Sequence, residues 1–167
     1  YFVYEKEWEK YFKYWLGEMH KWLEHCGINK RNLKNYETPS SELAHYSKRT
    51  VDIQYNFPFG IKELYGLAYR TDFDLRNHME RSGEDLRYID PSTNEKLIPH
   101  VVEPSFGLER TLLSVLLDVY TEDGERIVMK FPRWMAPTKV AVFPLLQNDK
   151  KLVQKAREIF ESILPRY

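Results

Sequence analysis

Two alternating segments around a proline–glycine turn constrain the fold of this chain more than any other feature. Apolar side chains alternate with polar ones over residues 51–57, at Val51, Ile53, Tyr55 and Phe57. This period of two is typical of a half-buried β-strand. The sequence NFPFG breaks the pattern, and residues 61–69 have the composition of a second strand. We therefore expect an antiparallel strand pair with one buried face.

Helical periodicity appears before and after this strand pair. Over residues 5–26, large apolar side chains recur at steps of three and four and predict a helix packed on a sheet: Trp8, Phe12, Trp15, Met19, Trp22 and Cys26. Gly27 is a suitable C-cap for it. Residues 41–48 resemble a short helix capped by Ser40 or Ser41. Thr71 and Asp74 resemble a capping box that begins a helix near residues 72–82.

The second half of the chain predicts further β and α elements. The sequence DPSTNE predicts the turn of a hairpin, whose outgoing strand leads into residues 99–106. An apolar helix is expected over residues 107–120, and RIVMKF reads as another strand. After Pro132 and Pro137, a short apolar strand at 137–145 and an amphipathic helix at 149–163 resemble the opening of a parallel α/β unit. The expected fold class is α+β, an antiparallel sheet flanked by helices, followed by a truncated α/β unit.

Composition excludes several classes of protein. Lys and Arg number 25 and Asp and Glu number 25, so no net charge draws the chain to nucleic acid or membrane. No apolar run is long enough for a membrane span, and we expect no membrane partner. Cys26 is the only cysteine, which rules out a disulfide within the chain and favours the cytoplasm. The five histidines are scattered and predict no metal cluster.

Three ordered blocks resemble one family. They are LAHYSKRTVDIQYNFPFGIKELYGLAYRTDFDL, PHVVEPSFGLERTLLSVLLDVY and APTKVAVFPL. Together they are similar to glycyl-tRNA synthetases of the archaeal and eukaryotic type, which are class II aminoacyl-tRNA synthetases. GLERT resembles class II motif 3, placed here at residues 103–117, and EPSFG is the glycyl-enzyme form of the residues before it.

The resemblance implies an organisation and an activity. Residues 1–136 would be the second half of a class II catalytic domain, and residues 137–167 the truncated start of an anticodon-binding domain. The complete enzyme would be a homodimer that uses ATP and Mg²⁺ to activate glycine as glycyl-adenylate and then attaches it to tRNA(Gly). Motifs 1 and 2 are not recognisable in the chain, so we expect the isolated chain to be inactive.

The resemblance also assigns site residues. Glu103 and Ser105 would hold the ammonium group of glycine, because a glycine pocket needs hydrogen-bond acceptors and no room for a side chain. Pro104, Phe106 and Gly107 would shape its wall, and Arg70 is a candidate for the glycine carboxylate. The alternative is that Glu103 ends a strand in solvent and that Ser105 is a helix N-cap.

The ATP site would lie at the beginning of the following helix. Arg110 would bind the γ-phosphate there, sharing an anion with free backbone N–H groups, and Glu63 would lie beside ATP and hold magnesium. The segment Gly107, Leu108 and Glu109, together with Leu64, would also line the nucleotide site. The alternatives are a surface ion pair for Arg110 and a solvent-facing strand residue for Glu63. Asp52 falls in a matching block without an assigned role.

Two rival functions remain open from the sequence. One is a non-catalytic relative, such as the accessory subunit of mitochondrial DNA polymerase. The presence of Glu63, Glu103, Ser105 and Arg110 argues against it, because a binding role needs no such set. The other is one half of a split synthetase whose partner chain carries motifs 1 and 2.

Overall fold

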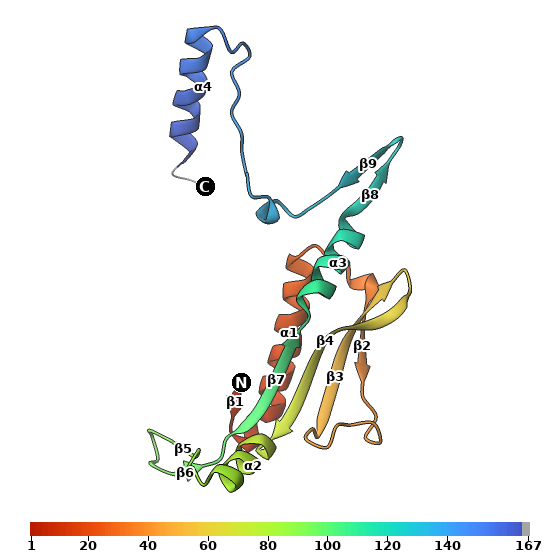
Figure 1. The fold of residues 1–167 in the computed structure, drawn as a ribbon, viewed down its shortest axis with the longest axis vertical. Helices are drawn as coiled ribbons and strands as arrows, with labels where there is room; N and C mark the ends of the chain where they lie inside the picture. The colour runs from red at the N-terminus through yellow and green to blue at the C-terminus, as the bar shows by residue number, and fades with distance from the viewer. Residues whose placement is uncertain (165–167) are drawn as a thin grey trace. The chain divides into compact units, whose positions relative to one another are not determined.

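A computed structural model describes residues 1–164, which form two compact units divided between Lys130 and Phe131. The first unit is built on a five-stranded antiparallel sheet with the strand order β1-β7-β4-β3-β2 (Figure 1). Its bounds are Phe2–Val3 for β1, Leu33–Glu37 for β2, Arg49–Phe57 for β3, Gly60–Thr71 for β4 and His100–Phe106 for β7. The predicted strand pair is therefore confirmed as β3 and β4, at the centre of the sheet.

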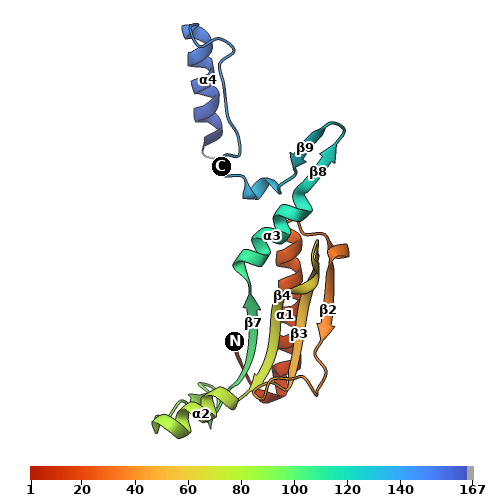
Figure 2. The same ribbon diagram turned by 45° about the vertical axis from the view of Figure 1, so that its right-hand side comes forward.

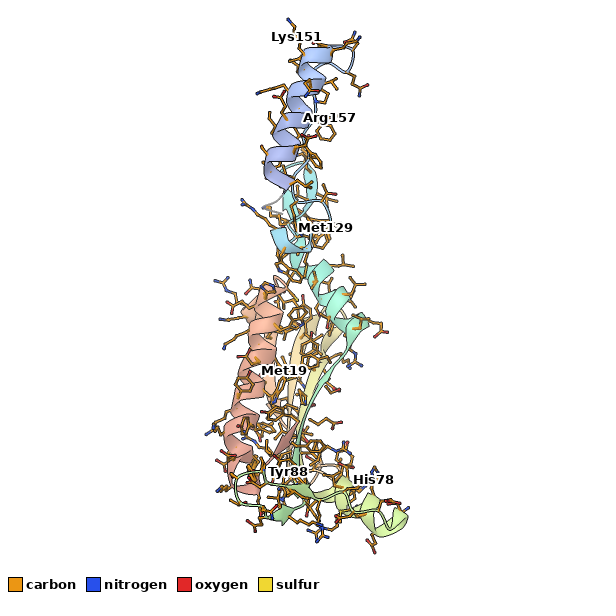
Figure 3. The ribbon with its side chains drawn as sticks, turned by 90° about the vertical axis from the view of Figure 1, so that its left-hand side faces the viewer. Met19, His78, Tyr88, Met129, Lys151 and Arg157 are labelled. Carbon is orange, nitrogen blue, oxygen red and sulfur yellow. The ribbon has the colours of Figure 1, made fainter. Side chains whose placement is uncertain are left out.

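One face of this sheet, which we call the core face, is covered by α1 (Trp8–His25) (Figure 2). A short 3₁₀ turn, Glu5–Glu7, leads into the helix. Phe12, Met19 and Leu23 of the helix are fully buried, and Met19 is labelled in Figure 3. Burying side chains of this size contributes roughly 1.5–3 kcal/mol each. The predicted apolar stripe is thus confirmed in its centre, whereas Trp22 remains 43% exposed.

The end of α1 follows the sequence prediction. Gly27 has a positive φ of 85°, a conformation that costs glycine little. The N–H of Ile28 donates to the carbonyl of Leu23, and the N–H of Gly27 donates to that of Glu24. These two bonds form a Schellman motif, which satisfies the last carbonyls of the helix. A 3₁₀ turn, Lys30–Asn32, then leads into β2.

Two predicted helix features are wrong. Residues 41–48 form turns, because the hydroxyl of Ser47 bonds to the carbonyls of Arg49 and Tyr69 and so ties this segment to the sheet. The helix α2 (Phe73–Ser82) is present, but it does not begin with a capping box. Thr71 has a φ of 57° instead, and the carboxylate of Asp74 accepts hydrogen bonds from Arg70.

The remaining elements of the first unit connect through tight turns. β5 (Tyr88–Ile89) and β6 (Lys96–Leu97) form the predicted hairpin. The helix α3 (Leu108–Val119) follows β7 directly, as predicted. β8 (Tyr120–Asp123) pairs with β9 (Arg126–Met129); only β9 was predicted. The carboxylate of Asp118, near the end of α3, accepts from Asn29, Asn32 and Tyr55 and so fixes α3 to the sheet.

The second unit contains a 3₁₀ turn, Arg133–Met135, and the helix α4 (Lys150–Ile163). Asp149 caps α4 by accepting from the backbone N–H groups of Lys151 and Leu152. The strand predicted at residues 137–145 is wrong, since no segment among the described residues pairs with it. Within residues 1–164, no helix combines the length and the apolar character that a membrane crossing requires.

Candidate functional site

The sheet face opposite α1, which we call the polar face, carries most of the predicted polar site residues. In the register of the strands, Gly66 of β4 lies between Asp52 of β3 and Ser105 of β7. Two residues further along β4, Ala68 lies opposite Glu103. Directly opposed residues in antiparallel strands point to the same face. The small side chains of β4 therefore form a floor, and polar side chains of the neighbouring strands rise on both sides of it.

A cavity of about 420 Å³ lies over this floor. Its lining includes the predicted residues Glu63, Arg70, Glu103 and Ser105. Asp52 and Glu42 also line it, so four carboxylates face one guanidinium. This balance of charge suits a ligand with a cationic group such as an ammonium.

A β-bulge brings Glu63 to the polar face. Ile53 pairs with Tyr65, but the next residue of β3, Gln54, pairs with Glu63, so Leu64 is the extra residue. In a regular strand, Glu63 would share a face with Tyr65, which is buried against the core. The bulge shifts the alternation by one residue. Leu64 is consequently buried, and the carboxylate of Glu63 reaches the cavity.

The carboxylates of Glu63 and Asp52 converge above Gly66. A Cβ atom at Gly66 would lie 3.5 Å from Oε1 of Glu63 and 3.7 Å from Oδ1 of Asp52. Burial raises the pKa of Asp52, and the negative charge of Glu63 raises it further. The absence of a side chain at Gly66 thus leaves open the space that both carboxylates face.

Arg70 links the cavity to the beginning of α2. Its Nε and Nη2 atoms donate to Asp74 at 2.7 and 2.9 Å, and its Nη1 donates to Oε2 of Glu103 at 2.7 Å. Its guanidinium carbon lies 3.9 Å from the centre of the Tyr46 ring. These contacts leave the Arg70 side chain 19% exposed. They also raise the pKa of Arg70 and lower that of Asp74, each through the hydrogen bonds between them.

Arg110 lies in the first turn of α3, next to Glu63. Its Nη1 donates to the backbone carbonyl of Glu63 at 2.5 Å and lies 4.0 Å from Oε2 of the same residue. The Arg110 side chain is 55% exposed. The two residues that the resemblance assigns to the γ-phosphate and to magnesium are therefore neighbours, and Arg110 keeps donors free for a further acceptor.

Comparison with known proteins gives one consistent result. Over 163 residues, 47% are identical to a protein named glycine–tRNA ligase from Clostridium acetobutylicum. The chain is similar to part of glycine–tRNA ligases. Proteins with the same name match at 45% identity over 169 residues in Staphylococcus haemolyticus and at 46% over 162 residues in Caldanaerobacter subterraneus subsp. tengcongensis.

These matches cover 95–98% of the chain but only 34–35% of the relatives. The chain thus spans about a third of the length of the glycine–tRNA ligases that it matches. No protein-family model matches it.

Several residues that the synthetase resemblance points to lie outside the cavity. Pro104 and Phe106 oppose Leu67 and Tyr65, so their side chains point to the core face, away from Glu103 and Ser105. Leu64 is buried, so only its backbone can face the region that the resemblance assigns to the nucleotide. Gly107 lies at the junction, where a Cβ atom would be 3.4 Å from the carbonyl of Leu64. The neighbouring Leu108 and Glu109 are exposed at the beginning of α3.

The structure adds residues that sequence reasoning missed. Gly66 forms the floor of the cavity, and a glycine inside a strand pattern is itself a signal of close approach by a ligand. Tyr46 contacts the guanidinium of Arg70 from a turn that the sequence predicted as a helix, and Asp74, predicted as a capping residue, holds Arg70 from α2. Asp52, which the sequence singled out without a role, lines the cavity beside Glu63.

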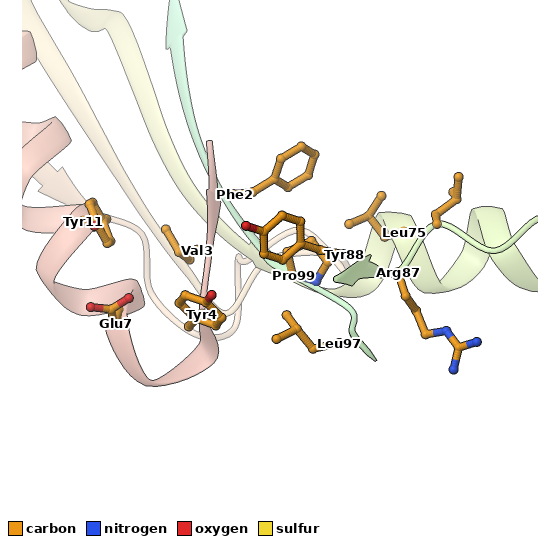
Figure 4. Close-up of a pocket in the computed structure, with 11 residues that line it drawn as sticks. Phe2, Val3, Tyr4, Glu7, Tyr11, Leu75, Arg87, Tyr88, Leu97 and Pro99 are labelled. Carbon is orange, nitrogen blue, oxygen red and sulfur yellow. The ribbon is translucent and has the colours of Figure 1, made fainter. Parts of the chain in front are cut away.

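Other hollows of the first unit lack this chemistry. A cavity of about 540 Å³ near β1 is lined mainly by apolar and aromatic side chains, among them Phe2, Tyr88 and Leu97 (Figure 4). An apolar groove between α1 and α3 contains Trp15 and Phe106. Across the described part of the chain, no group of three or more His, Cys, Asp or Glu residues is placed to hold a metal ion.

Proposed function

We propose that the chain is part of a class II glycine–tRNA ligase of the archaeal and eukaryotic type. The complete enzyme would activate glycine with ATP and attach it to tRNA(Gly). The observation that carries the proposal is the cavity that brings Glu63, Arg70, Glu103 and Ser105 together over Gly66 and Ala68. The similarity to glycine–tRNA ligases supports it independently. The type of synthetase rests on the sequence resemblance alone.

The cavity suits glycine in charge. Glu103 and Ser105 accept hydrogen bonds from the ammonium group, and Gly66 and Ala68 provide a floor with little or no side chain. Arg70 has five N–H groups, of which three take part in the hydrogen bonds described above. The remaining donors of Arg70 are available to the glycine carboxylate. Pro104, Phe106 and Gly107 shape the site through their backbone, because the two side chains point to the core face.

ATP would lie between the cavity and the beginning of α3. Arg110 holds the γ-phosphate, and the residues from Gly107 to Glu109 line the nucleotide with Leu64. A carboxylate oxygen of glycine attacks the α-phosphorus, the bond from that phosphorus to the bridging oxygen breaks, and pyrophosphate leaves. The positioning of the two reactants supplies much of the acceleration.

The carboxylates of Glu63 and Asp52 fit the coordination chemistry of Mg²⁺. Magnesium prefers oxygen ligands and is commonly held by one or two carboxylates together with substrate phosphates. Both carboxylates approach one point above Gly66. When bound, the ion would neutralise phosphate charge, while the residues of the chain orient glycine and ATP.

The proposed organisation follows the same resemblance. Residues 1–136 belong to the second half of the catalytic domain and residues 137–167 to the start of the anticodon-binding domain. The complete enzyme is a cytoplasmic homodimer in this proposal.

The test is glycine-dependent ATP–pyrophosphate exchange by the complete protein that contains this segment. We expect exchange with glycine and roughly 10–200-fold less with alanine, the range over which one methyl group changes substrate selection. Glu103→Gln should weaken the binding of glycine by roughly 1.5–3 kcal/mol, since a charge-assisted hydrogen bond becomes neutral. The binding of ATP should change little. Asp123→Asn, on the exposed β8–β9 turn, is the matched control. Failure of the wild-type protein to exchange with glycine would refute the proposal and leave the binding-protein alternative.

A further inference from the structure

Arg70, the hydrogen-bond partner of Glu103, is held in place by a residue of α2, outside the sheet. Arg70 donates to Oε2 of Glu103 at 2.7 Å, and the opposite edge of the same guanidinium is held by Asp74 through two bonds. Asp74 belongs to α2 and does not line the cavity. The three side chains therefore form a chain of charge-assisted bonds that leads from α2 to the cavity.

The backbone around Arg70 explains why this chain of contacts needs Asp74. Tyr69 pairs with Val102 and Thr71 with Val101, so Arg70 is the extra residue of a second β-bulge. The next residue, Thr71, has a left-handed φ of 57°. A long side chain on such a bulge loses rotamer freedom only if other groups hold it. Asp74 grips it bidentately, and Tyr46 lies against its flat face.

We propose that Asp74 is a positioning residue for glycine recognition, which holds Arg70 so that Arg70 in turn holds the carboxylate of Glu103. The inference rests on the proposed function, because it gives Glu103 the task of binding the glycine ammonium. Asp74 itself touches no substrate. It acts through Arg70, so the part of its contribution that passes through Glu103 disappears when Glu103 can no longer make a charged bond.

The geometry favours this role over a purely structural ion pair. A structural pair at the beginning of α2 already exists, since Asp72 accepts from Arg76 four residues later. In that pair Arg76 is 67% exposed, and neither Asp72 nor Arg76 lines the cavity. Arg70, by contrast, donates to Asp74 through Nε and Nη2 and to Glu103 through Nη1. The two pairs share a helix end and differ in whether they reach Glu103.

The experiment compares Asp74→Asn with Asp72→Asn in the complete protein. Both substitutions remove one negative charge from the same end of α2, so they affect the helix dipole alike. We expect Asp74→Asn to raise the KM for glycine about tenfold, equivalent to about 1.4 kcal/mol. The KM for ATP and the melting temperature should stay near those of the Asp72→Asn control. Equal glycine KM values in the two variants would overturn the inference.

A double variant separates positioning from stability. If Asp74 acts through Glu103, then Asp74→Asn combined with Glu103→Gln should lose less glycine affinity than the sum of the two single losses, because contacting residues are not additive. Glycine affinity by calorimetry provides the readout if exchange becomes too slow. Additive losses, or parallel increases in the KM for ATP, would show a structural role instead.

The outcome also distinguishes the inference from the proposed function. Wild-type exchange with glycine together with an unaffected Asp74→Asn variant overturns the inference alone. A wild-type protein that neither exchanges with glycine nor binds it overturns the proposed function, and the inference with it.

Discussion

Asp118 is expected to be the most costly carboxylate to remove from the first unit. Its side chain accepts three hydrogen bonds: from the backbone N–H of Asn29 at 2.7 Å, from Nδ2 of Asn32 at 2.5 Å and from the hydroxyl of Tyr55 at 3.1 Å. These donors come from the loop after α1 and from β3, whereas Asp118 lies in the last turn of α3. Asp118→Ala therefore removes the polar anchor between the sheet and the helix whose first turn contains Arg110.

The three bonds differ in what their loss costs. Tyr55 is 2% exposed, so its hydroxyl would lose its acceptor without water to replace it, at about 1–3 kcal/mol. The partly buried bond from Asn32 is charge-assisted and is worth about 1.5–3 kcal/mol before water compensates for it. The bond from Asn29 is exposed, and water replaces it at little cost. We expect Asp118→Ala to lower the free energy of unfolding by about 3 kcal/mol in total, which corresponds to roughly 10 °C in Tm.

Urea unfolding followed by tryptophan fluorescence measures this change, because Trp8, Trp15 and Trp22 belong to α1 of the same unit. The matched control is Asp123→Ala, which removes an exposed carboxylate paired with Arg126 and should cost less than about 0.5 kcal/mol. Asp118→Asn keeps the shape of the side chain and should cost about half as much as alanine. If the free energies of unfolding of the Asp118→Ala and Asp123→Ala variants differ by less than about 1 kcal/mol, the hydrogen bonds to Asp118 do not stabilise the fold as reasoned.

Four further predictions follow from the site and the core. Gly66→Ala should preserve the fold to within about 1 kcal/mol but raise the glycine KM about tenfold, because its Cβ would fill the floor between two carboxylates; an unchanged glycine KM would argue against the floor. Glu63→Gln should move the pKa of Asp52 down towards its ordinary value, since a neighbouring negative charge disappears; carboxyl NMR titration measures it, and a pKa equal to that in the unsubstituted protein would mean that burial alone is responsible. Cys26 is buried and its thiol pKa is raised by burial, so iodoacetamide should label it only after unfolding; rapid labelling of the native protein would contradict its burial. Arg110→Lys should reduce kcat/KM for ATP on the order of a hundredfold with little change in Tm, because lysine cannot grip a phosphate bidentately; near-normal exchange kinetics would make Arg110 a structural residue.

The sequence predicts the centre of the sheet better than its edges. Alternation marks β3 and β4 because one of their faces is buried, and helical spacing marks α1 for the same reason. β2 is largely exposed on both faces, so no periodic pattern identifies it. The turns at residues 41–48 could not be told from a helix, since the side-chain bonds of Ser47 that stop the helix come from distant strands.

The polar residues of the candidate site were predictable as a set, but not their geometry. Glu103, Ser105 and Arg110 stand out because polar groups crowd a strand-to-helix junction. Their relation to Glu63 depends on a bulge at Leu64, and a bulge leaves no periodic signature in a short strand. The role of Asp74 was misread as helix capping, because the local sequence cannot reveal a contact that depends on the positive φ of Thr71.

The two bulges of β4, at Leu64 and Arg70, enclose the segment of residues 65–69 that carries the floor of the cavity. A bulge already accommodates one residue more on its strand than on the partner strand. The strand can therefore gain or lose a residue at either bulge while the enclosed segment keeps its register. Within the segment, a single insertion would exchange the polar face for the core face. Evolutionary changes in the length of this strand should accordingly accumulate at its two bulges, and the segment between them should keep a fixed length.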